Sequence, residues 1–175
     1  MAMIQTSFET ALKKGAIGEG VVRAKMESKG YVVYTPATKG AHAFDLLAIK
    51  DKKKCIALDV KAKARRIYYD DTGIDERLYK VYKSFSVNHN MPFWIVFVDE
   101  FTKTIYGNCI DELDSPYKCT SKGIIYPLLS ESRDGKVMRY WHLSKMLYIA
   151  DITDDIANEL KEYSQRSYGY EKETE

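Results

Sequence analysis

The sequence predicts an α/β or α+β fold, in which a mixed central β-sheet is flanked by α-helices. Segments with helical and strand-like periodicity follow one another in the order helix, three strands, helix, strands, helix. Residues 93–98 are uniformly apolar, as in a strand that is buried on both faces. The chain has 175 residues, a length that suits one domain with a substantial core.

The first helix is predicted from a start signal, an apolar stripe and a stop signal. Thr6 and Glu9 have the spacing of a capping box, which would begin a helix near Ser7, and Gly30 is a typical stop. The apolar side chains that recur at helical spacing are Phe8, Leu12, Val22 and Met26. Three glycines interrupt the stretch: Gly15, Gly18 and Gly20. Because glycine weakens a helix, either the helix breaks there or another segment approaches its backbone closely.

The rest of the chain alternates between strands and helices. The predicted strands are 31–34, 44–49, 55–63, 93–98, 105–110, 124–129 and 137–143. A helix is predicted at 74–89, with Leu78, Val81, Tyr82 and Phe85 on one apolar stripe, and another at 152–164. The short polar turn at 50–54 and the turn at 133–135 each predict an antiparallel hairpin. We therefore expect one domain over residues 1–165, followed by a polar, acidic and frayed tail at 166–175.

Charge is distributed unevenly along the chain, although the net charge is only +2. Residues 12–66 contain fourteen Lys and Arg and five Asp and Glu, a local charge of +9. Residues 151–175 contain three basic and eight acidic residues, a local charge of −5. The basic block favours an anionic partner such as a phosphate backbone, although a solvated surface has a similar composition.

Cysteine usage and hydropathy favour an intracellular protein. The three cysteines, Cys55, Cys109 and Cys119, form no CxxC motif, so we expect reduced thiols in the cytoplasm. The sequence has no apolar run long enough to predict a membrane span. It also has no signal-peptide pattern at its first residues.

The predicted strand at 55–63 carries charged residues among apolar ones. Alternation places Asp59 and Lys61 side by side on one face of the strand. Asp45 is a similar exception in the preceding strand, between Phe44 and Leu46. Charge in such strands is costly unless it is paired or binds a metal ion. If the two strands form a hairpin, both carboxylates converge with the lysine beside them.

Two converging carboxylates favour a divalent cation between them. Without a cation, their repulsion would force one to take up a proton. Oxygen ligands predict a hard ion, Mg²⁺ or Mn²⁺, to which the main-chain carbonyl of Val60 could add a third ligand. The ion would polarise a phosphate and activate a bound water as the nucleophile. Lys61 would position or deprotonate that water, or offset charge on the phosphate.

Glu19 is a candidate supporting ligand. Steps of 3.6 residues from Phe8 place it on the inner stripe of the first helix, between Leu12 and Val22. The neighbouring glycines leave room for a close approach to the sheet. A carboxylate aimed at the sheet could hold a second metal ion or bind the first through water.

These residues together resemble the PD-(D/E)xK nuclease superfamily. The resemblance rests on Gly15-x-x-Gly18-Glu19 on a first helix, then Asp45, then Asp59-Val60-Lys61, and covers about residues 15–100. It is greatest to members like restriction endonucleases and Holliday junction resolvases. Two features depart from the usual motif: Asp59 stands where glutamate is commoner, and Phe44 replaces the proline before Asp45.

The resemblance implies a restriction-endonuclease-like core and Mg²⁺-dependent hydrolysis of phosphodiester bonds in DNA. Glu19, Asp45, Asp59 and Lys61 match the catalytic positions. The candidate nucleic-acid contacts are Lys63, Arg65, Arg66, Lys39 and His42. The expected partner is duplex or branched DNA, with RNA and a homodimer as open alternatives and no membrane association.

Other interpretations of the same residues remain open at this point. Asp59 and Lys61 could be an exposed pair on an edge strand, and Asp45 could cap a turn. Glu19 would face solvent if the helix began at Gly15. At the level of function, the alternative is a catalytically silent nuclease fold that binds nucleic acid or a protein partner.

Overall fold

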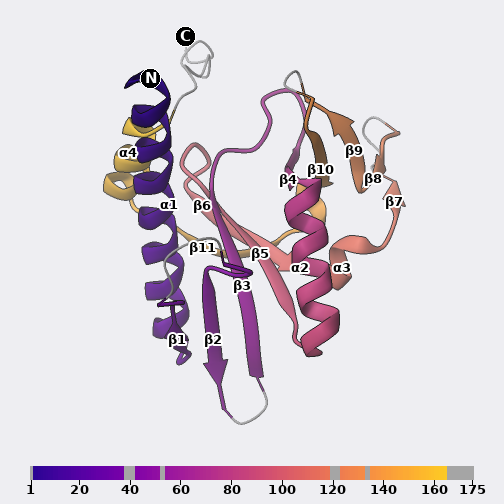
Figure 1. The fold of residues 1–175 in the computed structure, drawn as a ribbon, viewed down its shortest axis with the longest axis horizontal. Coiled ribbons are helices and arrows are strands. Elements are labelled where there is room, and N and C mark those ends of the chain that lie inside the picture. Colours follow the sequence, from indigo (N-terminus) through magenta and orange to yellow (C-terminus); the bar gives the residue numbers. More distant parts are fainter. Residues whose placement is uncertain (1, 38–41, 52–53, 119–122, 133–134, 165–175) are drawn as a thin grey trace.

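A computed structural model describes residues 2–37, 42–51, 54–118, 123–132 and 135–164. Its centre is a six-stranded sheet in the order β1-β2-β3-β5-β6-β11 (Figure 1). These strands are β1 (Val32–Tyr34), β2 (Leu46–Lys50), β3 (Lys54–Ala62), β5 (Phe93–Asp99), β6 (Thr104–Cys109) and β11 (Leu147–Asp151). Strands β3 and β5 are parallel and all other neighbours are antiparallel, so the sheet is mixed as predicted.

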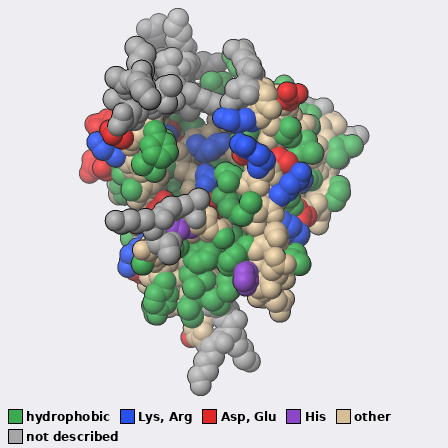
Figure 2. Space-filling model, in the orientation of Figure 1, with side chains coloured by type: hydrophobic (Ala, Val, Ile, Leu, Met, Phe, Trp, Pro, Cys, Tyr) green, Lys and Arg blue, Asp and Glu red, His purple; other side chains and the backbone are tan. Residues whose placement is uncertain are grey.

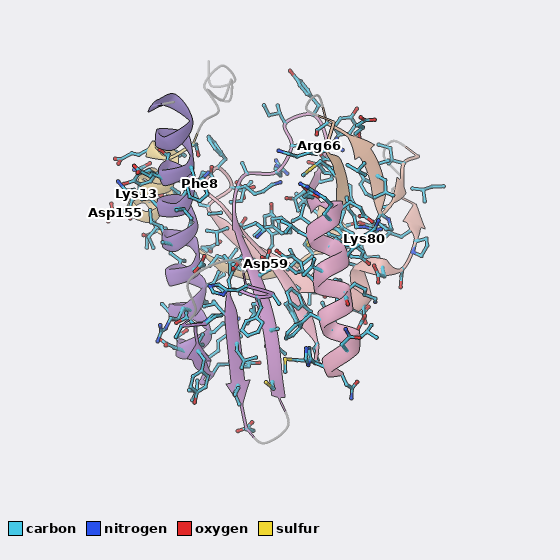
Figure 3. The ribbon with its side chains drawn as sticks, viewed as in Figure 1. Phe8, Lys13, Asp59, Arg66, Lys80 and Asp155 are labelled. Carbon is cyan, nitrogen blue, oxygen red and sulfur yellow. The ribbon has the colours of Figure 1, made fainter. Side chains whose placement is uncertain are left out.

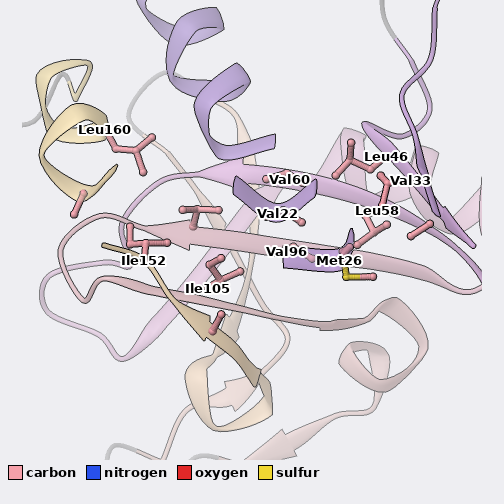
Figure 4. Close-up of a cluster of buried hydrophobic side chains, with 14 residues drawn as sticks. Val22, Met26, Val33, Leu46, Leu58, Val60, Val96, Ile105, Ile152 and Leu160 are labelled. Carbon is pink, nitrogen blue, oxygen red and sulfur yellow. The ribbon is translucent and has the colours of Figure 1, made fainter. Parts of the chain in front are cut away.

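Helices cover both faces of this sheet. On one face lie α1 (Ala2–Ser28) and α4 (Asp154–Glu162). Their side chains Val22, Met26 and Leu160 join a buried apolar cluster with the sheet (Figure 4). The other face is covered by α2 (Glu76–His89) and α3 (Ile110–Asp114), through a second cluster that includes Tyr82 and Leu113. Strand β3 shows the alternation directly, because Leu58 and Val60 join the first cluster and Ala57 joins the second.

Smaller elements extend the structure beyond the ends of β3 and α2. A three-stranded sheet has the order β4-β10-β9, with β4 (Asp71–Asp75), β10 (Val137–His142) and β9 (Leu128–Glu131). A two-stranded ribbon pairs β7 (Tyr117–Lys118) with β8 (Ile125–Tyr126), and a short 3₁₀ turn spans Leu143–Lys145. Figure 1 shows this group on the side of α2, away from α1.

The predicted hairpins are confirmed, and several element boundaries are wrong. Strands β2 and β3 pair antiparallel, as do β9 and β10. The predicted strand at 124–129 is divided into β8 and β9 at Pro127, which has no N–H to donate to a ladder. The elements not predicted are β4, α3, β7, the 3₁₀ turn Leu143–Lys145 and β11, all of which are short. The expected tail at 166–175 lies outside the described residues.

The stripes predicted for the two long helices are each wrong in part. Helix α1 begins at Ala2 rather than near Ser7, and Phe8 and Leu12 are exposed. Only the later positions of that stripe, including Val22, are buried. In α2 the buried face holds Tyr79, Tyr82 and Ser86, whereas Leu78 and Val81 of the predicted stripe are exposed. The buried face depends on how each helix is rotated against the sheet, which helical periodicity alone does not fix.

Helix α1 continues without a break through its three glycines, and Gly18 explains why a glycine is needed there. A Cβ at Gly18 would lie 2.9 Å from the Cβ of Ala62, closer than two carbon atoms can approach without movement. A Cβ at Gly20 would meet nothing within 4 Å. The close contact at Gly18 therefore sets the distance between α1 and the end of β3, and places Glu19 beside that end.

We expect Gly18→Ala to destabilise the protein and Gly20→Ala to stabilise it. At position 18 the overpacking cost of about 1–3 kcal/mol should exceed the gain in helix propensity. At position 20 only the propensity gain of about 0.5–1 kcal/mol applies. Denaturant unfolding of both variants measures the difference. A Gly18→Ala protein as stable as Gly20→Ala would contradict the close packing of α1 on β3.

Candidate active site

The β2–β3 hairpin fixes Asp45 against the middle of β3. The backbone N–H of Asp45 donates to the carbonyl oxygen of Leu58 at 2.9 Å, just before β2 begins. In turn, its carboxylate Oδ2 accepts the backbone N–H of Val60 at 2.7 Å. Asp45 is thus held at both its main chain and its side chain beside the residues that flank Asp59.

Asp59 is buried in the centre of the sheet, with only 2% of its surface exposed. Its Oδ1 accepts two hydrogen bonds, from Lys61 Nζ at 2.7 Å and from the Tyr82 hydroxyl at 2.5 Å. Its Oδ2 is buried and has no hydrogen-bond partner within the described part of the chain. Strand β3 lies between β2 and β5, so the interpretation of Asp59 and Lys61 as an exposed edge-strand pair is wrong.

The carboxylates of this site perturb one another. Burial, together with the nearby charge of Asp59, raises the pKa of Asp45 from 3.8 to about 6. Burial also raises the pKa of the half-buried Glu19, and the charge of Lys61 opposes this effect. Glu19 on α1 therefore lies close enough to Asp59 and Lys61 on β3 for their charges to shift its pKa.

The oxygen atoms present suit a hard divalent cation. Asp59 Oδ2 is a buried carboxylate oxygen without a donor, which is costly unless a cation satisfies it. Within the described ranges, no three His, Cys, Asp or Glu side chains are grouped closely enough to enclose a metal ion by themselves. Mg²⁺ does not need such a cage, because it usually takes one or two carboxylates and keeps several waters. Asp45, Asp59 and the Val60 carbonyl would be sufficient for that mode of binding.

A cleft of about 680 Å³ opens above these residues. Its floor is the end of β3 and the residues that follow, and its lining includes Glu19, Asp45, Val60 and Lys61. One wall comes from α1 and the residues after α4, and the other from β4 and β10. Asp59 lies beneath the lining rather than in it. Figure 2 shows Lys and Arg side chains gathered around the hollow on this face.

The same arrangement of sheet and helices occurs in a known nuclease. The solved structure of the Holliday junction resolvase Hjc from Archaeoglobus fulgidus superimposes with a TM-score of 0.51 and 11% sequence identity. The match covers 82% of this chain and 99% of the resolvase chain. The chain has a resolvase-like fold. No family model and no curated protein sequence matches it.

The resolvase-like fold confirms the predicted fold class, a mixed sheet flanked by helices with a nuclease-like core. An identity of 11% shows the fold alone, so the roles of individual residues remain predictions that depend on the geometry of the site. In this fold Asp45 lies immediately before β2, Asp59 and Lys61 lie on β3, and Glu19 lies on the first helix.

The predicted nucleic-acid contacts occupy different positions around the cleft. Lys63 and Arg66 line it, and Arg66 is labelled in Figure 3 near β10. Arg65 lies outside the lining and pairs with Asp70 at 3.1 Å. His42 is exposed and close enough to Glu19 to favour its charged form. The remaining candidate, Lys39, lies outside the described residues.

Tyr82 is a site residue that the sequence did not reveal. It was predicted only as part of an apolar helix stripe, yet its hydroxyl donates to Asp59 across 23 positions of sequence. Burial and the charges of Asp59 and Asp45 hold the pKa of Tyr82 well above its ordinary value, so the hydroxyl keeps its proton. Lys61 and Tyr82 both donate to Asp59 Oδ1, whereas Oδ2 has no hydrogen-bond partner among the described residues.

None of the helices in the described ranges is long and apolar enough to cross a membrane.

Proposed function

We propose that this protein is a metal-dependent DNA endonuclease, with its active site at Glu19, Asp45, Asp59 and Lys61. The observation that carries the proposal is Asp59, a fully buried carboxylate with one unpartnered oxygen beside a second carboxylate whose pKa is raised. That pair would form a cation site under a cleft lined by basic residues. The resolvase-like fold agrees with a nucleic-acid substrate.

The metal ion would supply Lewis-acid activation of the phosphate and of a water molecule. Asp45 and Asp59 would hold it, with the Val60 carbonyl as a further oxygen ligand. Lys61 is fixed by Asp59 at 2.7 Å, while 26% of its side chain remains exposed to the cleft. Its ammonium would orient the attacking water and offset charge on the phosphate. Glu19 would support the binding of the ion from α1.

A cleavage panel tests the proposal directly. Supercoiled plasmid, linear duplex, flapped DNA and four-way junctions are incubated with Mg²⁺ or Mn²⁺, and in parallel with EDTA. We expect metal-dependent scission of at least one DNA substrate and none with EDTA. If no substrate is cut with either metal ion, the protein is not a nuclease under this mechanism.

We expect Glu19→Gln to reduce the cleavage rate by about 10- to 100-fold and to raise the Mg²⁺ requirement, because a supporting contact matters less than a direct ligand. DNA affinity should stay unchanged. Titrating Mg²⁺ at saturating DNA separates the two effects. Glu9→Gln, an exposed residue earlier in α1, is the matched control. Wild-type behaviour of Glu19→Gln across the whole titration would remove Glu19 from the site.

The raised pKa of Asp45 predicts a pH-dependent metal affinity. Because Asp45 must lose its proton to bind the ion, apparent affinity should fall about tenfold per pH unit below pH 6. Calorimetric titration with Mn²⁺ at pH 5 and pH 7.5 measures this difference. Equal affinities at the two pH values would show that Asp45 is not a ligand.

The same shift has a consequence for stability without metal. The pKa of Asp45 is about 6 in the folded protein, above its ordinary value of 3.8, which applies to the unfolded chain. Between these two pH values the folded state therefore binds more protons than the unfolded state. The stabilising contribution of protonated Asp45 is present near pH 4 and is lost as the pH rises through 6. We therefore expect the Asp45→Asn protein, unfolded thermally in EDTA, to lack the fall in stability between pH 4 and pH 6 that the titration of Asp45 causes in the wild type.

A further inference from the structure

Three cations around the cleft are each held by a buried carboxylate. Lys61 pairs with Asp59 at 2.7 Å, as described above. Arg66 pairs with Asp71 through two hydrogen bonds of 2.5 and 2.6 Å, and the Asp71 side chain is fully buried. Lys14 on α1 pairs at 2.6 Å with Glu100, whose side chain is also fully buried. All three cations line the cleft, whereas the carboxylates lie behind its surface.

Fold stability alone gives a weak reason for three such pairs. Burying a carboxylate is costly, and a buried ion pair often stabilises a protein no better than apolar packing would. The pairs do fix three cations at set positions on the walls and floor of one cleft. Lys and Arg side chains held in this way are the groups that chiefly bind the phosphates of a nucleic-acid strand.

The size of the cleft restricts what can reach its floor. A volume of about 680 Å³ is in the range of small-molecule sites and far too small for a DNA duplex. Walls stand on both sides, formed by Tyr163 and Ser164 after α4 and by Met138 and Tyr140 of β10. A cleft of this size with a wall on each side favours a single strand, whose bases are unpaired, over a duplex.

Two aromatic side chains, Tyr140 and Tyr163, line the cleft beside these cations. The guanidinium of Arg66 lies 3.8 Å from the centre of the Tyr140 ring and 4.3 Å from that of Tyr69. Tyr163 lies on the opposite wall. A basic groove with interspersed aromatic rings is the usual design of a site for single-stranded nucleic acid.

We propose that the cleft binds an unpaired DNA strand, so that the preferred substrate is single-stranded at the phosphate to be cut. Lys14 and Arg66 hold phosphates on opposite walls, and Tyr163 and Tyr140 contact bases. The statement about cutting rests on the nuclease function proposed above, whereas the statement about binding does not.

Binding in EDTA tests the inference without catalysis. Fluorescence anisotropy compares a labelled single strand, a blunt duplex of the same sequence and that duplex with a single-stranded flap. We expect the single strand and the flap to bind at least roughly tenfold more tightly than the blunt duplex, since stacking needs unpaired bases. Equal or tighter binding of the blunt duplex overturns the inference. Absence of cleavage in Mg²⁺ together with the expected binding preference would refute only the nuclease function.

Two sets of variants test whether the single strand binds in the cleft. Tyr163→Ala should weaken single-strand binding by roughly tenfold and leave duplex binding unchanged, while Tyr163→Phe retains affinity. The matched control is Tyr148→Ala, an exposed tyrosine of β11 outside the cleft. Unchanged single-strand affinity in Tyr163→Ala would overturn the base contact assigned to this wall.

The double variant Lys14→Met with Glu100→Gln removes the ion pair without leaving an unpaired buried charge. It should weaken single-strand binding and reduce the log–log salt slope by about 0.7 for the lost phosphate contact. Lys13→Met, on the exposed side of the same helix turn, is the control (Figure 3). Thermal unfolding verifies that each variant is folded. An unchanged salt slope in the folded double variant would remove Lys14 from the binding path.

Discussion

Asp59→Asn and Asp45→Asn are each expected to abolish DNA cleavage, with a loss of at least about 10³-fold. Lewis-acid stabilisation contributes several kcal/mol to the transition state, and each 1.36 kcal/mol corresponds to tenfold in rate. Removing a carboxylate that binds the ion directly should forfeit most of that contribution. Quantified plasmid nicking with a Mg²⁺ titration measures the loss.

Both variants should keep the fold, because asparagine preserves the local hydrogen bonds. At position 45 the amide oxygen can still accept the N–H of Val60, and at position 59 it can accept the Tyr82 hydroxyl. Asp155→Asn, at an exposed carboxylate of α4, provides the matched control and should cut at the wild-type rate (Figure 3). Wild-type cleavage by a folded Asp45→Asn or Asp59→Asn protein would refute the proposed site.

Lys61→Met is expected to lower the cleavage rate by about 10²–10⁴-fold while metal binding survives. The ammonium is not a metal ligand, so its loss removes the group that orients water and offsets phosphate charge but leaves the carboxylates. Calorimetric titration with Mn²⁺, run beside single-turnover cleavage, separates these two outcomes. A Lys61→Met protein with wild-type turnover would exclude Lys61 from the mechanism.

Lys61→Arg distinguishes the two roles open to this lysine. Arginine keeps the positive charge but cannot give up its proton, and its planar fork fits a different geometry. Poor activity is expected if Lys61 transfers a proton. Full activity in Lys61→Arg would exclude proton transfer and leave only the electrostatic role. Lys80→Arg, on the exposed side of α2, controls for a general effect of the substitution (Figure 3).

The pattern of strands in the sequence was informative because its signals are local. Alternation along β3 placed Asp59 and Lys61 together on one face, and the short turn before β3 predicted its antiparallel pairing with β2. Both statements depend only on residues that are neighbours in the chain or that are joined by a short turn. The buried strand β5 was predicted for the same reason, from its continuous apolar composition.

Glu19 was placed on the inner side of its helix by a stripe that is partly wrong, and it is nevertheless half-buried. Its stripe was traced from Phe8 and Leu12, which are exposed. What brings Glu19 beside β3 is its neighbour Gly18, which packs against Ala62 with no room for a side chain. The sequence offered that close approach as one of two explanations for the glycines, and could not choose between them without the sheet.

By itself, the sequence determined the mixed α/β architecture, the β2–β3 hairpin and the face of β3 that carries charge, because periodicity and turn length are properties of adjacent residues. The tertiary structure alone decided which distant groups meet them. Three contacts are of this kind: the Tyr82 hydroxyl donates to Asp59, Lys14 pairs with Glu100, and Arg66 pairs with Asp71. Each of them joins residues from separate parts of the fold. Their contacts follow from how helices rotate and pack on the sheet, a balance of burial and sterics over the whole fold that no local pattern encodes.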